Sequence, residues 1–234
     1  MPVTYMRTLL LSIAAAVVFA LPATASADTI TFTAPATGAN QGSGGASQFT
    51  LDHHDAYTWR IGGVNLAGQS ITGATLTIRN ISNWDANANR LFIHLLDTAR
   101  NAGVGSFQDA SATQTPVTDI NDDFAGTRYT NNPLVAPGTL NTFLTSQSFT
   151  TTARTYVYTF TADQLSVLSQ YFMNGGDIAF GLDPDCHFWN DGITFQFTTK
   201  PTATPEPTTM VLLGTGLAGL YYSRKRKKQA KTSD

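Results

Sequence analysis

The sequence has one cysteine, Cys186, in 234 residues, and the stretch from 28 to 200 contains a single lysine and no glutamate. A chain with one cysteine forms no internal disulfide, so an exported domain of this sequence is held together by its core, alone or with a metal. We expect Cys186 to be buried, as unpaired cysteines commonly are. Because lysine and glutamate normally cover exposed helices, their scarcity beside abundant Thr, Ser, Asn and Gly indicates a β domain.

Positive charge is also scarce between residues 28 and 200, where seven Arg or Lys stand against fourteen Asp. The net charge of this stretch is near −7, although the whole chain has only −2 because its two ends are basic. Such a surface has no basic patch to neutralise phosphates, which excludes nucleic acid as a partner. About 173 residues are enough for one sizeable core, so we predict a single ectodomain at 28–200.

The N-terminal 27 residues have the order of a secretory signal peptide. Arg7 precedes an apolar stretch at 9–21, Pro22 ends it, and Ala25-Ser26-Ala27 supplies small residues for cleavage. A positive start, a short apolar middle and an A-x-A ending direct a chain into export. We therefore predict a signal peptide at 1–27 and a mature chain that begins at Asp28.

The C-terminal end has three parts in a fixed order. Residues 201–207 form a Pro/Thr linker that ends in Pro-Glu-Pro, residues 208–223 are apolar or small, and residues 224–234 begin with five consecutive cations. The apolar part is shorter than the roughly 20 residues that span a bilayer comfortably. Flanking aromatic and basic side chains extend such a segment. We predict a hydrophobic sorting or transmembrane helix at 208–223 and a basic cytoplasmic tail at 224–234.

This C-terminal end resembles the PEP-CTERM sorting signal of Gram-negative bacteria. The resemblance rests on Pro205, Glu206 and Pro207, on the glycine-containing apolar segment and on the basic cluster, about 25 residues in all. It implies that an exosortase, a membrane-embedded transpeptidase-like enzyme, handles the chain near Pro-Glu-Pro. In that family such tails accompany exopolysaccharide and biofilm production. The implied location is an inner-membrane intermediate, followed by the cell surface or the extracellular matrix.

Alternation of apolar and polar residues predicts an all-β fold for the ectodomain. One helix is expected at 161–175, where Thr161 and Gln164 form a capping box and Gly175 ends the element. The segment 101–138 has few strand signals and is expected to consist of turns or a functional surface. Eight or nine strands and one short helix predict a jelly-roll-like β-sandwich, with strands expected at 29–33, 49–51, 57–61, 71–81, 91–96, 143–149, 155–160, 177–182 and 193–199.

The loop 183–192 is the densest polar motif in the chain, and two interpretations of it stay open. Asp183, Asp185 and Asp191, with Asn190, offer the oxygen ligands that Ca²⁺ prefers. The same residues are also common turn formers. Calcium is the only cofactor that the sequence suggests. The segment from Asp85 to Asn89 has a similar ambiguity, because its alternating Asp and Asn side chains suit either a calcium loop or an Asx-rich connection.

Two further groups of residues are candidates for binding. Trp84 and Trp189 stand in polar loop contexts, so they are candidate surface rings for stacking on carbohydrate. His53 and His54 lie on opposite faces of an extended segment and do not share one metal easily. A site that joins them to His94 and His187 is the less favoured alternative.

The sequence favours a non-enzymatic protein of the cell surface or matrix. It has no nucleophile elbow of the G-x-S-x-G type, and Cys186 next to His187 in sequence is not a through-space dyad. A carbohydrate-binding module, with or without stabilisation by calcium, is one alternative. The other is a polysaccharide hydrolase that acts through Asp183, Asp185 or Asp191.

Overall fold

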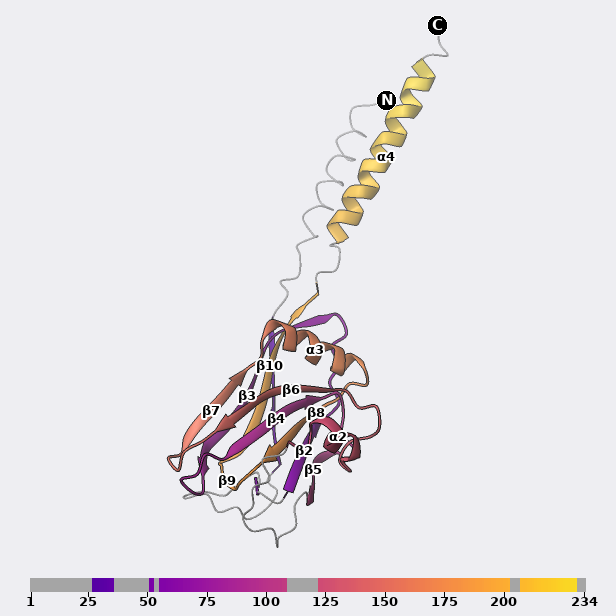
Figure 1. The fold of residues 1–234 in the computed structure, drawn as a ribbon. Helices are drawn as coiled ribbons and strands as arrows, with labels where there is room; N and C mark the ends of the chain where they lie inside the picture. The colour runs from indigo at the N-terminus through magenta and orange to yellow at the C-terminus, as the bar shows by residue number, and fades with distance from the viewer. Residues whose placement is uncertain (1–26, 36–50, 53–54, 109–121, 203–206, 231–234) are drawn as a thin grey trace. The chain divides into compact units, whose positions relative to one another are not determined.

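The computed structural model of the chain describes residues 27–35, 51–52, 55–108, 122–202 and 207–230. The predicted signal peptide, apart from Ala27, falls outside these residues. Residues 27–200 form one compact unit. This unit is a sandwich of two antiparallel five-stranded sheets, which confirms the predicted all-β class (Figure 1).

The first sheet has the strand order β1-β10-β3-β7, with the short β9 paired to β3, and the second has the order β5-β2-β8-β4-β6. The strands of the first sheet are β1 (Asp28–Thr33), β3 (Gln69–Asn83), β7 (Arg154–Thr159), β9 (Phe188–Trp189) and β10 (Ile193–Pro201). The strands of the second sheet are β2 (Asp55–Ile61), β4 (Arg90–Leu96), β5 (Gly103–Gln108), β6 (Asn141–Ser148) and β8 (Ile178–Pro184).

The connectivity is that of a jelly roll. When β5 and β9 are set aside, the other eight described strands run first-eighth-third-sixth in one sheet and second-seventh-fourth-fifth in the other. This order places strands that are distant in sequence side by side, as two interlocked Greek keys do. The jelly-roll-like sandwich predicted from the sequence is therefore the observed fold.

Alternating apolar side chains from both sheets fill the space between them. Tyr57, Trp59 and Ile61 point inward from β2, and each is nearly inaccessible to solvent. Phe180 of β8 meets Phe195 of β10 across the sandwich, with ring centroids 5.0 Å apart in an edge-to-face contact. This period of two is the pattern that predicted the strands, and burial of large aromatic rings is the main source of their stability.

Helix α3 (Ala162–Met173) lies across one end of the sandwich (Figure 1) and packs Leu168 and Phe172 into the core. The predicted capping box is present. The Thr161 side chain accepts a hydrogen bond from the Gln164 backbone amide, and the Gln164 side chain accepts one from the Thr161 backbone amide. These bonds satisfy amide groups that a helix N-terminus leaves without partners.

The segment 101–138 differs most from expectation. In the described parts of this segment, residues 103–108 form strand β5 at the edge of the second sheet, and Gly126–Asn131 form a short helix, α2. Regular elements thus stand where turns were predicted, and the alternative of a functional surface stays a prediction. The strand predicted at 49–51 begins outside the described residues, and Leu51 makes only an isolated bridge to Phe188. The sequence of β5 does not predict a strand, because glycine has a low strand propensity. The strand is stabilised by its pairing with β2 and less by its own side chains.

Candidate functional site

The segments that hold the predicted surface tryptophans lie side by side, and Trp189 belongs to the short strand β9 rather than to the loop predicted at 183–192. The Trp84 amide donates to the His187 carbonyl at 3.1 Å, and the Trp84 indole Nε1 donates to Cys186 Sγ at 3.1 Å. Strand β9 pairs with the end of β3, opposite Ser82 and Asn83. Residues about 100 positions apart in sequence thus form one surface, which we call the tryptophan platform and define as Trp84, His187 and Trp189.

The rings of the tryptophan platform are open to a ligand to different degrees. Trp84 is 58% exposed, and Trp189 is partly buried with its ring 4.2 Å from that of His187. His187 Nδ1 is 3.8 Å from Asp52 Oδ1. Cys186 is partly buried, rather than fully buried as had been expected, and its Sγ accepts the hydrogen bond from Trp84. Burial raises the pKa of its thiol. A flat apolar ring beside polar groups suits an amphipathic ligand such as a sugar.

The four residues predicted as calcium ligands have separate partners. Asp183 is buried and accepts from the Asp123 amide at 2.6 Å, whereas Asp185 accepts from the Arg90 amide. Asp191 accepts from the Asn80 side chain, and Asn190 accepts from the Gly192 amide at 2.9 Å. Within the described ranges, no three His, Cys, Asp or Glu side chains gather as metal ligands. The contacts of Asn190 and Asp191 are those of turn formers, and the calcium set stays a prediction.

The other residues considered as metal ligands, in the segment 85–89 and among the histidines, do not form a metal site within the described residues either. Asp85 Oδ1 accepts from the Asn87 amide at 3.0 Å and from Asn89 Nδ2 at 2.8 Å, as in an Asx-rich connection. His53 and His54 fall outside the described residues. His94 is buried in β4 and binds other groups, so within the described residues it does not join His187 in a metal cluster.

Asp185 is a carboxylate in an unfavourable environment. Burial raises its pKa to about 6 and Asp85 adds like-charge repulsion, while the hydrogen bond from the Arg90 amide and the Arg90 charge oppose both effects. The folded protein therefore holds the Asp185 proton more tightly than the unfolded chain does. It follows that this group lowers the free energy of unfolding as the pH rises from about 4 to about 6.

We expect Asp185→Asn to remove this downward contribution, so that the free energy of unfolding relative to the wild type increases from pH 4 to pH 7 and is about 1 kcal/mol higher at pH 7, after allowance for solvent access to the side chain. Urea denaturation at pH 4, 5, 6 and 7 measures both effects. The Asp163→Asn variant is the control, because it removes one exposed carboxylate elsewhere in the domain. A slope equal to that of the wild type in Asp185→Asn would contradict the assignment.

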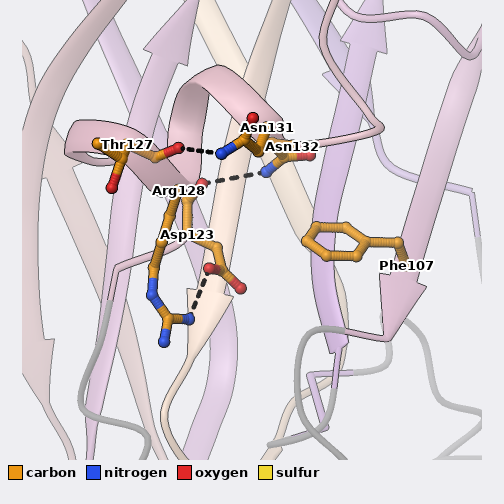
Figure 2. Close-up of a pocket in the computed structure, with 6 residues that line it drawn as sticks. All are labelled: Phe107, Asp123, Thr127, Arg128, Asn131 and Asn132. Atoms are coloured by element: carbon orange, nitrogen blue, oxygen red, sulfur yellow. Dashed lines mark hydrogen bonds and ion pairs between the residues drawn. The ribbon is translucent and has the colours of Figure 1, made fainter.

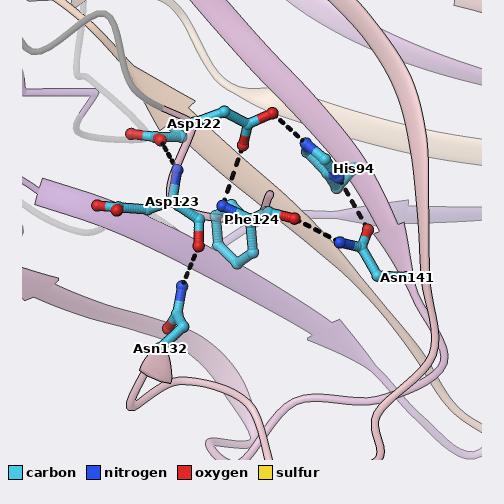
Figure 3. Close-up of polar contacts among 7 residues, drawn as sticks. His94, Asp122, Asp123, Phe124, Asn132 and Asn141 are labelled. Carbon is cyan, nitrogen blue, oxygen red and sulfur yellow. Dashed lines mark hydrogen bonds and ion pairs between the residues drawn. The ribbon is translucent and has the colours of Figure 1, made fainter. Parts of the chain in front are cut away.

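A second polar region lies on the outer face of the second sheet. Small residues there leave room for residues 122–135, which we call the covering segment. Phe124 fills this space, because its ring stands where a Cβ on Gly181 would be, at 2.8–2.9 Å. It packs with residues from three strands and the covering loop. Beside this apolar contact, His94 Nε2 lies 2.8 Å from Asp122 Oδ2 and His94 Nδ1 lies 2.8 Å from Asn141 Oδ1 (Figure 3).

The network in Figure 3 continues from Asp122 to Asp123 and fixes the covering segment to the sheet. The Asp123 amide donates to Asp183, the Asp123 carbonyl accepts from Asn132 Nδ2 at 3.1 Å, and Asn141 Nδ2 donates to the Phe124 carbonyl. Backbone and side-chain groups thus satisfy one another away from water, which favours a single arrangement.

A hollow of about 220 Å³ opens beside this network (Figure 2), between β5 and α2. Arg128 Nη1 donates to Asp123 Oδ1 at 2.9 Å at its wall. The hollow is lined by Phe107, Asp123, Thr127, Arg128, Asn131 and Asn132. The hollow lies within the segment 101–138, for which the sequence predicted turns or a functional surface without naming residues. Its only signals were the pair Asp122-Asp123 before an aromatic residue and a histidine in an apolar strand.

The fold and the platform define the class of the protein: a jelly-roll domain with aromatic and acidic loops, followed by a helical C-terminal segment. Comparison with protein families then finds the PEP-CTERM protein-sorting motif at residues 203–227. The chain thus carries a PEP-CTERM sorting signal, which implies export, processing by an exosortase and sorting to the cell surface of a Gram-negative bacterium. Neither the curated proteins nor the solved structures include a significant match to the chain.

Helix α4 (Pro207–Ala230) begins within the matched motif, includes the apolar stretch 208–223 and extends beyond the end of the motif at residue 227. Pro205 and Glu206 of the sorting motif lie outside the described residues. In the described part of the chain, no helix combines the length and the hydropathy that a membrane crossing requires. This finding differs from the predicted transmembrane helix.

Proposed function

We propose that the protein is a non-enzymatic component of the cell surface or extracellular matrix, whose jelly-roll domain associates with exopolysaccharide after exosortase-dependent sorting. The sorting motif at residues 203–227 is the observation that carries this proposal. The acidic ectodomain supports it as well, because an excess of negative charge keeps a secreted protein soluble and does not attract nucleic acid.

The test of this proposal is fractionation of the full chain in two hosts that contain an exosortase, one producing exopolysaccharide and one deficient in it. We expect the protein in the matrix fraction of the producing host and in the culture medium or loosely on cells of the deficient host. An equal distribution in the two hosts would contradict association with the polysaccharide while leaving the sorting function intact.

A second candidate function is carbohydrate binding by the tryptophan platform. In one form of this hypothesis, bound calcium stabilises the folded domain. The observation that favours it is the contact of the exposed Trp84 with Cys186 and the His187 carbonyl, in the segment that also holds the partly exposed Trp189. A ligand that binds only the folded state raises its stability. Calcium stabilisation would therefore appear as a melting temperature that falls on addition of a chelator at neutral pH.

We expect Trp84→Ala to weaken polysaccharide binding by about tenfold, because loss of a stacked ring removes roughly 1–1.5 kcal/mol. Affinity gel electrophoresis in neutral polysaccharides measures the change. Phe143→Ala is the matched control, since this aromatic residue is 52% exposed on β6, outside the platform. Equal retardation of Trp84→Ala and Phe143→Ala would argue against the platform as a sugar-binding surface.

A further inference from the structure

The hollow between β5 and α2 contains a carboxylate that its protein neighbours satisfy only in part. The Asp123 side chain is 7% exposed, and its Oδ1 accepts from Arg128. Its Oδ2 is buried and, among the residues that the structure describes, has no hydrogen-bond partner. In Figure 2 this second oxygen lies on the side away from the Arg128 bond, toward the ring of Phe107. Leaving a buried acceptor unsatisfied is costly, so the position suits a ligand that donates a hydrogen bond.

The charges around Asp123 indicate what kind of donor fits. The Arg128 guanidinium already binds the same carboxylate, and a cation at Oδ2 would lie next to this fixed positive charge. The nearby carboxylate of Asp183 is bound to the Asp123 amide, and within the described residues no group of three metal ligands forms here. A neutral hydroxyl donor therefore matches the site better than a metal ion does.

The rest of the lining suits an amphipathic ligand. Phe107 is partly exposed and contributes an apolar ring to one wall, while Thr127 and Asn131 are exposed polar residues on α2. An aromatic ring opposite hydrogen-bonding side chains matches a sugar, which has apolar C–H faces and a rim of hydroxyl groups. The volume of about 220 Å³ is below the 300–1,000 Å³ of sites for drug-sized ligands, so one sugar unit fits better than a long segment.

The sheet and the network beneath the hollow hold this arrangement in advance of binding. The Asp123 amide is fixed by Asp183, and its carbonyl is fixed by Asn132, so the backbone at this position is held from two sides. Phe107 extends from β5 opposite Ala56 of β2. Groups that are already in position lose little conformational entropy when a ligand binds.

From these observations we propose that the hollow is a subsite for one neutral sugar residue. Asp123 Oδ2 accepts a hydrogen bond from a sugar hydroxyl, and the Phe107 ring packs against the face of the sugar. Arg128 orients the carboxylate. This inference rests on the proposed association with polysaccharide and locates a contact point that is separate from the tryptophan platform.

The experiment measures binding of the full chain to three neutral polysaccharides, dextran, galactomannan and xyloglucan, by affinity gel electrophoresis. We expect Asp123→Asn and Phe107→Ala each to weaken binding to at least one of them by about tenfold or more. Asp123→Asn keeps the shape of the side chain and an oxygen for Arg128, and a melting temperature near that of the wild type shows that it folds. Phe107→Ala tests the same subsite without altering the polar network.

Three other results of these experiments would overturn the proposed sugar subsite. Unchanged binding by both folded variants, with weaker binding by Trp84→Ala, overturns the subsite and leaves the polysaccharide proposal standing. Absence of binding by the wild type to all three polymers overturns the neutral-sugar subsite, and the matrix fractionation then judges the proposed function independently. Calcium binding that Asp123→Asn abolishes, in a titration with CaCl₂ alone, would overturn the sugar assignment in favour of a cation site.

Discussion

Replacing Phe124 with Ala is expected to lower the free energy of unfolding by about 3–5 kcal/mol, as truncation of a fully buried aromatic side chain commonly does. Phe124 is 0% exposed and occupies the space above Gly181. Without its ring the covering segment loses its apolar contact with the second sheet, while the bonds of His94 and Asn141 become open to water. Chemical denaturation with two-state analysis measures the loss.

Phe143→Ala is the matched control for Phe124→Ala. Both rings contact His94, at centroid distances of 5.7 Å for Phe124 and 5.2 Å for Phe143, but Phe143 is 52% exposed. Its truncation should cost less than about 1 kcal/mol. Gly181→Ala should destabilise by about 1–3 kcal/mol, because the added methyl group displaces the Phe124 ring. Similar losses for Phe124→Ala and Phe143→Ala would show that the covering segment is not anchored by Phe124.

Deletion of residues 203–234 is expected to abolish retention of the protein at the cell surface. This deletion removes the whole matched sorting motif, so an exosortase no longer has the segment that it recognises. Export itself should continue, because the predicted signal peptide at 1–27 is intact. The measurement is the fraction of protein on intact cells against the fraction in the medium, by immunoblot. The jelly-roll domain, residues 27–200, lies outside the deleted segment.

The matched control for that deletion removes residues 231–234 alone. These four residues follow the matched motif, which ends at residue 227. We expect this shorter chain to be retained like the wild type. Surface retention of the chain that lacks 203–234, at the wild-type level, would show that the jelly-roll domain reaches and holds the surface without the motif.

The elements that the sequence predicted well are those whose own side chains determine their structure. Residues 57–61 alternate apolar and polar side chains, and β2 buries Tyr57, Trp59 and Ile61 on one face. Helix α3 begins at the predicted capping box, because Thr161 and Gln164 bond each other's amides within one turn. Local chemistry of this kind can be predicted from the order of residues alone.

The elements that were missed depend on residues far away in sequence. Strand β5 consists largely of small and polar residues and is held by pairing with β2. The position of Phe124 is set by Gly181, whose lack of a side chain has this meaning only once the two strands and the covering loop are in place. Propensity along the chain does not contain this information.

The candidate sites also combine features that the local sequence predicts with features that depend on distant residues. Polar contexts correctly indicated Trp84 as a surface residue, and only the pairing of β3 with β9 brings it near His187 and Trp189. The acidic residues of loop 183–192 are neighbours in sequence, but the fold directs Asp183 and Asp185 to different backbone amides. Asp123 could not be singled out from the sequence, because two features of the fold distinguish it: its burial and an oxygen without a hydrogen-bond partner among the described residues.

The most direct test of the central claim compares the full chain in one Gram-negative host with its exosortase present and with that enzyme deleted. The claim is that the sorting motif at residues 203–227 delivers an exported jelly-roll domain to the cell surface. With the exosortase present, we predict surface-exposed protein that external protease removes from intact cells. With the enzyme deleted, we predict loss of that pool and accumulation of a precursor in the membrane fraction. Equal surface pools of equal mass in the two strains would contradict the account.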